Sequence, residues 1–310
     1  MNDSVNKMLN ITSKRVSRVT MSLALAFSVN VTMVMPAHAQ SINASEAKTR
    51  INIAGRERML IQRVVKSACF SSLGIERAAY RAELVETEDL FEQSLLALQN
   101  GDPALGLRPE NAPGILAELE VVSMEWGKVA SLADVAVSPR GISIEGLYSL
   151  DALGLDLLAK ANAAVQTISQ TYVEQLDELP LIVSVSLDIA GRQRMLSQKM
   201  AKEFCLIDAG VTPADNRANL AETISVFNAT LAGLQNGLPG MVIPAPNYDI
   251  RQKLLEVEHL WAPVDAVLQA VADGGQITDE DRKAVVENME AVLAAMNEAV
   301  GMYEYINAVP

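Results

Sequence analysis

The sequence has little of the material from which catalytic and cofactor sites are usually built. Its 310 residues include two cysteines, two histidines and 4% aromatic residues. It has no CxxC or CxxCH motif, no glycine loop that would cradle a phosphate and no serine-triad pattern. These absences argue against dithiol redox, c-type haem, nucleotide and serine-hydrolase chemistry. We therefore expect a protein that is not an enzyme and that needs no cofactor.

Long apolar runs are also scarce, and the one candidate lies at the amino terminus. A basic segment precedes the mostly apolar residues 21–35, and Ala-His-Ala at 37–39 gives a small-x-small cleavage pattern before Gln40. This arrangement is typical of a secretory signal peptide over residues 1–39. An uncleaved anchor is the alternative, although the apolar stretch is shorter than the ~20 residues of a membrane span. The predicted compartment is a bacterial periplasm, with a mature chain that starts at Gln40.

Basic residues are scarce as well. Removing the leader takes away four basic residues and one acidic residue, which leaves 21 basic and 37 acidic residues and a net charge of −16. A surface with this charge is a poor partner for nucleic acid or anionic lipid. The abundance of Ala, Leu, Val and Glu, together with few aromatic residues, favours an all-α protein.

What the sequence does contain is a long internal repeat. Residues Ile53–Cys69 and Ile189–Cys205 share ten identities in seventeen positions at an ungapped offset of 136. The offset later becomes 135, which pairs Asn162 with Asn297. Because this period is far longer than a solenoid repeat, it indicates two copies of a whole domain in tandem. We place the first copy at residues 40–179 and the second at 180–310.

Each copy is predicted to form a four-helix up-down bundle. Glycines act as stop signals after the helices, as in Asn100-Gly101 of the first copy and Asn236-Gly237 of the second. Pro180, between the copies, suggests a kinked but nearly continuous helical connection. The predicted helices cover residues 43–73, 76–100, 112–135 and 145–178 in the first copy, and 181–208, 213–236, 247–272 and 278–308 in the second.

The repeated first helix has two different faces. One face carries apolar residues such as Leu60 and Leu196 and is ordinary core. A second face, here called the polar face, follows heptad-like spacing but contains Gly, Arg and Gln. Glycine inside a helix costs about 1 kcal/mol relative to alanine, so something is expected to approach the backbone closely there. The polar face consists of Gly55, Arg58, Gln62, Val65 and Cys69 in the first copy and of Gly191, Arg194, Gln198, Ala201 and Cys205 in the second.

Two interpretations of Arg58 and Arg194 are open. Arginines on helices are usually solvated, which is what we expect of Arg56, Arg63 and Lys199 away from the polar face. If the two first helices instead pack about a pseudo-twofold axis, Arg58 and Arg194 meet and need a counter-anion. A small planar oxyanion matches the parallel N–H donors of a guanidinium group.

The run AGRQRMLSQKMAK at residues 190–202 resembles the first helix of the PilJ-type N-terminal sensor module. Related helical modules form the periplasmic sensor of NarX-like nitrate and nitrite kinases. The resemblance covers both copies. It implies one anion between paired first helices, held by an arginine from each and by backbone near the preceding glycine. The implied positions are Arg58, Arg194, Gly55 and Gly191, with Gln62 and Gln198 on the same face and Arg63 and Lys199 as a second basic position.

Two functions follow as hypotheses. The leading one is an exported sensor or binding protein for a small anion, nitrate or nitrite, whose site assembles within a monomer because the copies are fused. Receptors of this kind normally continue into a membrane span and an output domain. This sequence contains neither, so we expect a membrane receptor or kinase as partner. The competing hypothesis is a ligand-free adaptor or scaffold for a membrane receptor or pilus-related complex, with exposed arginines and an apolar surface patch.

The two cysteines occupy equivalent positions. Each follows its arginine by eleven residues, which returns a helix to within about 20° of the same face. The twofold axis of the sensor family implies parallel first helices, which would bring Cys69 beside Cys205 and allow a disulfide in an oxidising compartment. The alternative is two separately buried thiols.

A metal site is not expected. His259 follows Glu256 with the spacing of half a di-iron carboxylate motif, but the first copy has Ser123 at the matching position. A bundle site of that type needs two such motifs. His259 is therefore predicted to be an ordinary helix residue.

Overall fold

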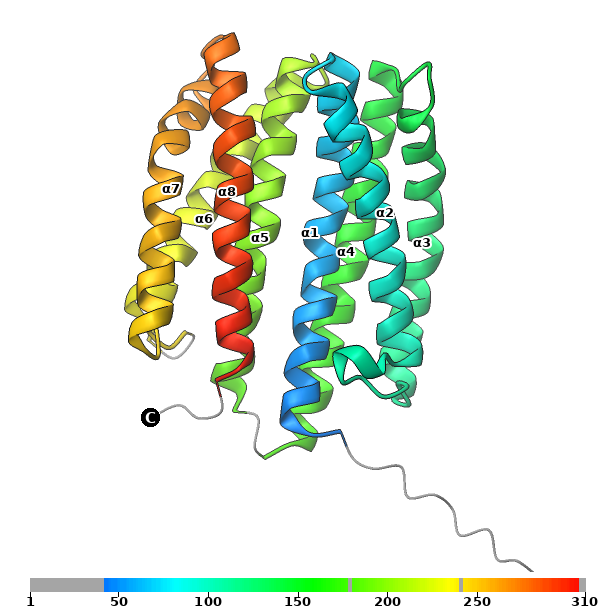
Figure 1. Cartoon of the computed structure of the whole chain (residues 1–310), viewed down its shortest axis with the longest axis vertical. Helices are drawn as coiled ribbons and strands as arrows, with labels where there is room; N and C mark the ends of the chain where they lie inside the picture. Colours follow the sequence, from blue (N-terminus) through cyan, green and yellow to red (C-terminus); the bar gives the residue numbers. More distant parts are fainter. Residues whose placement is uncertain (1–41, 178–179, 240–241, 307–310) are drawn as a thin grey trace, which may run out of the picture. The chain divides into compact units, whose positions relative to one another are not determined.

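The computed structural model of the chain describes residues 42–177, 180–239 and 242–306. These residues belong to one compact unit of helices, with no β-strand among them, and form two tandem four-helix bundles (Figure 1). The predicted all-α class is confirmed.

The predicted signal peptide, residues 1–39, lies outside the described residues. None of the helices described combines the length and apolarity needed to cross a membrane. The helices are α1 Ala44–Leu73, α2 Arg77–Asn100, α3 Pro113–Val137, α4 Ile144–Gln175, α5 Leu181–Asp208, α6 Pro213–Asn236, α7 Tyr248–Ala272 and α8 Asp279–Glu304, with a short 3-10 helix, η1, at Pro103–Leu105.

The helix ends lie within a few residues of the predicted ones. Gly74 after α1 and Gly210 after α5 have φ angles of 80° and 75°, in the left-handed region that glycine adopts without strain. Gly101 and Gly237 end α2 and α6 in the same way, with φ of 78° and 85°. Glycine stop signals at equivalent positions therefore end α2 and α6 at the same length of 24 residues.

The predicted continuous connection between the copies is wrong. α4 ends at Gln175, and Leu176 has an extended backbone with φ −126° and ψ 100°. Pro180 precedes the first residue of α5, where a missing N–H removes no intrahelical hydrogen bond. The helix therefore stops before the proline, and α5 starts again antiparallel to α4 (Figure 1). The domain boundary at residues 179/180 falls beside residues outside the described ranges and stays a prediction.

Each bundle packs in the same way. The first helix contacts the second and fourth, and the third helix closes the bundle against the fourth and second. Apolar residues at helical spacing supply the contacts, as Leu119, Val122 and Trp126 do on α3 and as Val257 and Trp261 do on α7. The buried apolar residues of both bundles join into one continuous core.

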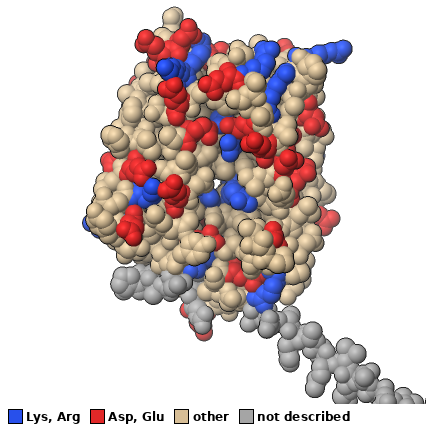
Figure 2. All heavy atoms as spheres, in the orientation of Figure 1, with Lys and Arg blue, Asp and Glu red and all other residues tan. Residues whose placement is uncertain are grey.

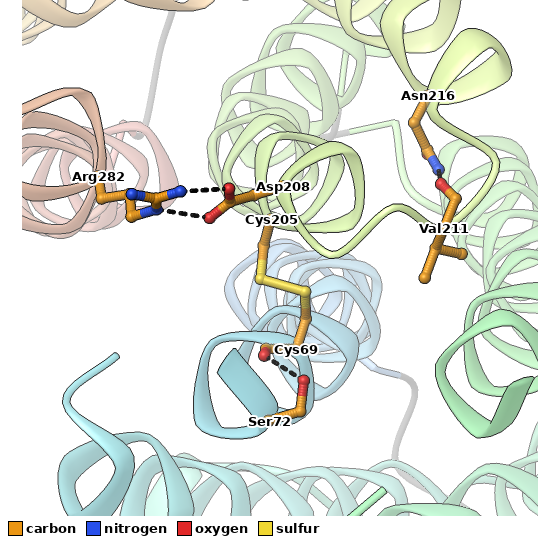
Figure 3. Close-up of a disulfide and its surroundings, with 7 residues drawn as sticks. All are labelled: Cys69, Ser72, Cys205, Asp208, Val211, Asn216 and Arg282. Carbon is orange, nitrogen blue, oxygen red and sulfur yellow. Dashed lines mark hydrogen bonds and ion pairs between the residues drawn. A yellow bond between two sulfur atoms is a disulfide. The ribbon is translucent and has the colours of Figure 1, made fainter. Parts of the chain in front are cut away.

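The two bundles are joined through α1 and α5, here called the central pair. It is the most extensive helix pair in the molecule. Cys69 and Cys205 form a disulfide with Cα atoms 6.1 Å apart, which confirms the predicted bond and the parallel packing. Figure 3 shows the disulfide joining the C-terminal turns of the two helices, and nearby Asp208 accepts two hydrogen bonds of 2.7 Å from Arg282 of α8.

Helices surround the central pair, so several of its charged residues are buried, among them Lys66 and Lys202. Lys66 of α1 pairs with Glu83 at 2.8 Å and also with Glu290 of α8. Lys202 of α5 pairs with Asp151 of α4 at 2.6 Å. Each lysine thus reaches an acid of the other bundle, which satisfies a charge that burial would otherwise make costly and ties the bundles together.

Candidate functional site

Arg58 and Arg194 converge in the middle of the central pair. Their exposures are 1% and 3%. A Cβ atom added to Gly55 would lie 3.3 Å from Nη2 of Arg58 and 3.8 Å from Nη2 of Arg194. One added to Gly191 would lie 3.4 Å from Nη2 of Arg194 and 3.7 Å from Nη2 of Arg58. Both guanidinium groups therefore lie against both glycines, so the solvated interpretation of these arginines is wrong. These four residues are called the arginine site below.

The fourth helix of each bundle contributes an asparagine to the arginine site. Arg58 Nη1 donates to Oδ1 of Asn162 on α4 at 3.2 Å, and Arg194 Nη1 donates to Oδ1 of Asn297 on α8 at 3.4 Å. The two asparagines are equivalent in the repeat. The site therefore has the pseudo-twofold symmetry expected of paired first helices.

A third contact of each arginine crosses to the other first helix, and here the symmetry breaks. Arg58 Nη2 donates to Oδ1 of Asp188 at 2.6 Å. Arg194 Nη2 donates to Oδ1 of the equivalent residue, Asn52, at 2.8 Å. Arg58 thus has a carboxylate in direct contact, whereas the acceptors that Arg194 meets among the described residues are amide and carbonyl oxygens.

Two further charged residues adjoin this contact. Glu304 of α8 accepts hydrogen bonds of 2.5 Å from Asn52 Nδ2 and Thr49 Oγ1. This carboxylate is therefore one side chain removed from Arg194. On the other side, Arg192 donates to Asp188 at 3.0 Å, and its own side chain is 44% exposed. Asp188 is consequently shared between a buried and a largely solvated arginine.

The electrostatics follow from this placement. Burial, together with the nearby charges of Arg56 and Arg58, lowers the pKa of Arg194 to about 9, and Glu304 only partly opposes the shift. Burial also lowers the pKa of Arg58, but there Asp188 acts in the opposite direction. Arg194 Nε is buried and has no hydrogen-bond partner among the described residues. A buried guanidinium that retains its proton favours an anion beside it.

Gln62 and Gln198 extend the polar face beyond the arginines. Both are buried, and Gln198 Nε2 donates to Glu290 at 3.4 Å. Their Oε1 atoms have no hydrogen-bond partner within the described part of the chain. No hydrogen bond between described residues joins either amide to a guanidinium of the arginine site, so these two residues line the face without completing the site.

The second basic position lies apart from the arginine site. Arg63 pairs with Glu83 at 3.3 Å, and Lys199 pairs with Glu203 at 2.6 Å. Their side chains are 24% and 19% exposed, and Arg56 similarly donates to a serine of α2. The expectation that these three residues are solvated is wrong, because α2 and α6 cover this side of the central pair.

The surface has two hollows between the two bundles. Figure 2 shows a small opening in the middle of the face, between the two bundles, bordered by Lys or Arg side chains. A separate crevice of about 180 Å³ lies between α4 and α5, with Ser169, Val185 and Asp188 among its lining residues. Asp188 therefore touches both this crevice and Arg58, and its side chain is 18% exposed.

His259 is exposed on α7, as predicted for an ordinary helix residue. Among the described residues, no group of three or more His, Cys, Asp or Glu side chains is arranged to hold a metal ion.

Sequence reasoning missed all four side chains that accept hydrogen bonds from the two arginines among the described residues. The repeat pairs Asn162 with Asn297, but it did not indicate that they accept hydrogen bonds from the arginines. Asn52 and Asp188 lie just outside the block of identities. The internal repeat carried the available signal. Asn162 and Asn297 are identical in the two copies, whereas position 52 is Asn and the equivalent position 188 is Asp.

Comparison with known proteins identifies the family to which the two copies belong. The PilJ family model, described as the N-terminal part of type IV pili methyl-accepting chemotaxis transducers, matches the chain twice, at residues 40–142 and 183–286. The chain belongs to this family. It is also 24% identical over 271 residues to the methyl-accepting chemotaxis protein McpN of Pseudomonas aeruginosa. The match covers 83% of this chain and 48% of that protein, so the chain spans about half the length of this relative. The PilJ-type resemblance and the tandem helical bundles are thereby confirmed.

Proposed function

We propose that the protein is an exported sensor or binding protein for a small anion, with nitrate and nitrite as the first candidates. The observation that carries the proposal is Arg194, a buried guanidinium that no carboxylate of the described residues contacts directly and that lies beside Arg58. Carboxylates or oxyanions are the natural partners of such a group.

The charges favour an anion with a single negative charge. Arg58 and Arg194 are two buried cations, and Asp188 is the one carboxylate that contacts either of them directly among the described residues. One guanidinium is therefore left without a directly contacting carboxylate, and a monovalent anion would supply the missing contact. Glycine at positions 55 and 191 keeps space beside both guanidinium groups, since an added Cβ would lie within 3.4 Å of an Nη2 atom.

The proposed setting is the periplasm, reached by a cleavable signal peptide. The relative is a chemotaxis receptor, which suggests that this chain acts through contact with a membrane receptor or kinase. Because both first helices belong to one chain, a monomer supplies the complete arginine site.

The test is isothermal titration of the purified chain with nitrate, nitrite, chloride and sulfate, with sedimentation to establish the molecular mass. We expect nitrate or nitrite to bind with one anion per monomeric chain. Binding of one anion per two chains would mean that the copies pair between molecules. The absence of a binding signal with all four anions would overturn the proposal.

The competing function, a ligand-free adaptor, allows the arginines to point to solvent and needs an exposed apolar patch. The burial of Arg58 and Arg194 favours the anion proposal over it. An adaptor would bind a receptor or pilus component equally well with or without nitrate, so a partner whose affinity ignores the anion would support the adaptor instead.

A further inference from the structure

The two arginines of the arginine site are not equivalent, because their cross-helix partners differ in charge. Position 188 is Asp and the equivalent position 52 is Asn. The Asp188 carboxylate contacts Arg58 at 2.6 Å, whereas the Asn52 amide contacts Arg194 at 2.8 Å.

The carboxylate of the other side lies on the fourth helix. Glu304 of α8 is bonded to Asn52, and the residue equivalent to Glu304 on α4 is Ser169. Each side of the site thus carries one carboxylate, but only Asp188 contacts an arginine of the site directly among the described residues. The difference between the sides is one of position and not of total charge.

We propose that Asp188 competes with the anion for Arg58 and thereby sets the affinity of the site, leaving Arg194 as the arginine that meets the ligand. This inference rests on the proposed function. The physical basis is that a guanidinium in a direct ion pair has fewer N–H donors and less net charge to offer a second anion.

Its position also places Asp188 where an anion can approach. The residue lines the crevice between α4 and α5, and its second oxygen, Oδ2, is bonded to the largely exposed Arg192 at 3.0 Å. The carboxylate can therefore be replaced at Arg58 while Arg192 still holds it.

The first experiment is titration of nitrate into the wild type and Asp188→Asn, an isosteric change that copies the first bundle. We expect nitrate to bind the variant about tenfold more tightly or better, the effect of freeing one charged hydrogen-bonding group. Glu222→Gln removes an exposed carboxylate of α6 and is the control for net charge, with affinity expected to match the wild type.

A second variant tests position at constant net charge. Asn52→Asp combined with Glu304→Gln moves a carboxylate from α8 to α1, so that Arg194 gains a direct ion pair and both arginines then have one. We expect nitrate affinity to fall about tenfold or more. Circular dichroism and melting temperature, with and without nitrate, establish that each variant is folded.

The outcomes separate this inference from the proposed function. If the wild type binds nitrate but Asp188→Asn binds no more tightly, or the charge swap leaves the affinity unchanged, the inference is overturned and the function stands. Should only Asp188→Asn bind, Asp188 acts as an internal substitute for the ligand, so the role of Asp188 stands and the proposed function falls. Absence of binding in both overturns both.

Discussion

The two bundles have the same helices, the same glycine turns and the same first-helix motif, yet they distribute charge differently. At the arginine site, the first bundle presents Asn52 and the second presents Asp188. Near the N-terminus of α1, the first bundle buries Arg50, which forms ion pairs with Glu46 at 3.2 Å and with Glu110 at 3.1 Å. The second bundle has Ile182 and Ser186 at the positions of Glu46 and Arg50.

The difference shows what fusion of two copies permits. In a symmetric dimer a substitution enters both sides of the interface at once. In a single chain each side changes independently, so one arginine can acquire a counter-charge while the other does not. Arg58 and Arg194 are the same residue in both copies, as are Asn162 and Asn297, whereas positions 52 and 188 differ.

The largest expected effect comes from cutting the covalent link between the equivalent helices. Cys69→Ser combined with Cys205→Ser removes a bond between residues 136 positions apart. Chain entropy predicts a loss of up to about 4–5 kcal/mol in the free energy of unfolding. Guanidinium unfolding measures it. Reductant in the denaturant should lower the stability of the wild type but not that of the variant, and equal stability of variant and oxidised wild type would contradict the prediction.

The next effect tests the buried ion pairs of Arg50, which the second bundle lacks at the equivalent positions. Arg50→Ala leaves the buried carboxylate of Glu110 without its arginine, and we expect a loss of about 3–5 kcal/mol in unfolding free energy. The control is Lys253→Ala in the second bundle, whose partners Glu256 and Glu298 are 51% and 62% exposed. That change should cost about 0–1 kcal/mol. Similar losses in the two variants would show that burial of the network adds nothing.

The arginine site gives effects of opposite sign on the two sides. Arg194→Gln removes the uncompensated charge, so we expect nitrate affinity to fall roughly 10 to 150-fold while the melting temperature without ligand stays equal or rises. Arg58→Gln deprives Asp188 of its buried partner, so the same melting temperature should fall and the loss of affinity should be smaller. Titration and thermal unfolding of both variants test this contrast, which an identical response of the two would refute.

The smallest effect concerns pH and another unequal pair. Glu57 on α1 is buried with no partner for Oε1 within the described residues, whereas the equivalent Gln193 donates to Thr230. Burial raises the pKa of Glu57 to about 8, compared with about 4.3 in an unfolded chain. The folded chain thus holds a proton that the unfolded chain releases. Its stabilising contribution is complete below about pH 4 and is lost as the pH rises through 8.

Glu57→Gln should remove this pH dependence and raise the unfolding free energy at pH 8 by about 1–2 kcal/mol, because an amide costs less to bury than a carboxylate. Chemical unfolding at pH 5 and pH 8 measures the change. The matched variant Gln193→Glu should introduce the same fall in the second bundle. A wild type and Glu57→Gln with parallel pH profiles would disprove the assignment.

Much of the fold was determined by local sequence. Glycines 74, 101, 210 and 237 ended helices where predicted, since only glycine takes positive φ without strain. The 136-residue offset predicted two bundles of matching length. The parallel central pair was predicted through the family resemblance, and the disulfide between Cys69 and Cys205 followed from it.

Tertiary structure decided the rest, since the partners of a charge come from elements distant in sequence. Arg63 and Lys199 looked solvated by their helix face, but neighbouring helices partly cover them and both form ion pairs. Asp188 lies just before the repeated motif, and nothing in the sequence marked it as a partner of Arg58. Packing places its carboxylate 2.6 Å from Arg58, which lies 130 positions away. Helix periodicity specifies which face a side chain occupies, but only the packed neighbour determines whether that face meets water, a counter-charge or a ligand.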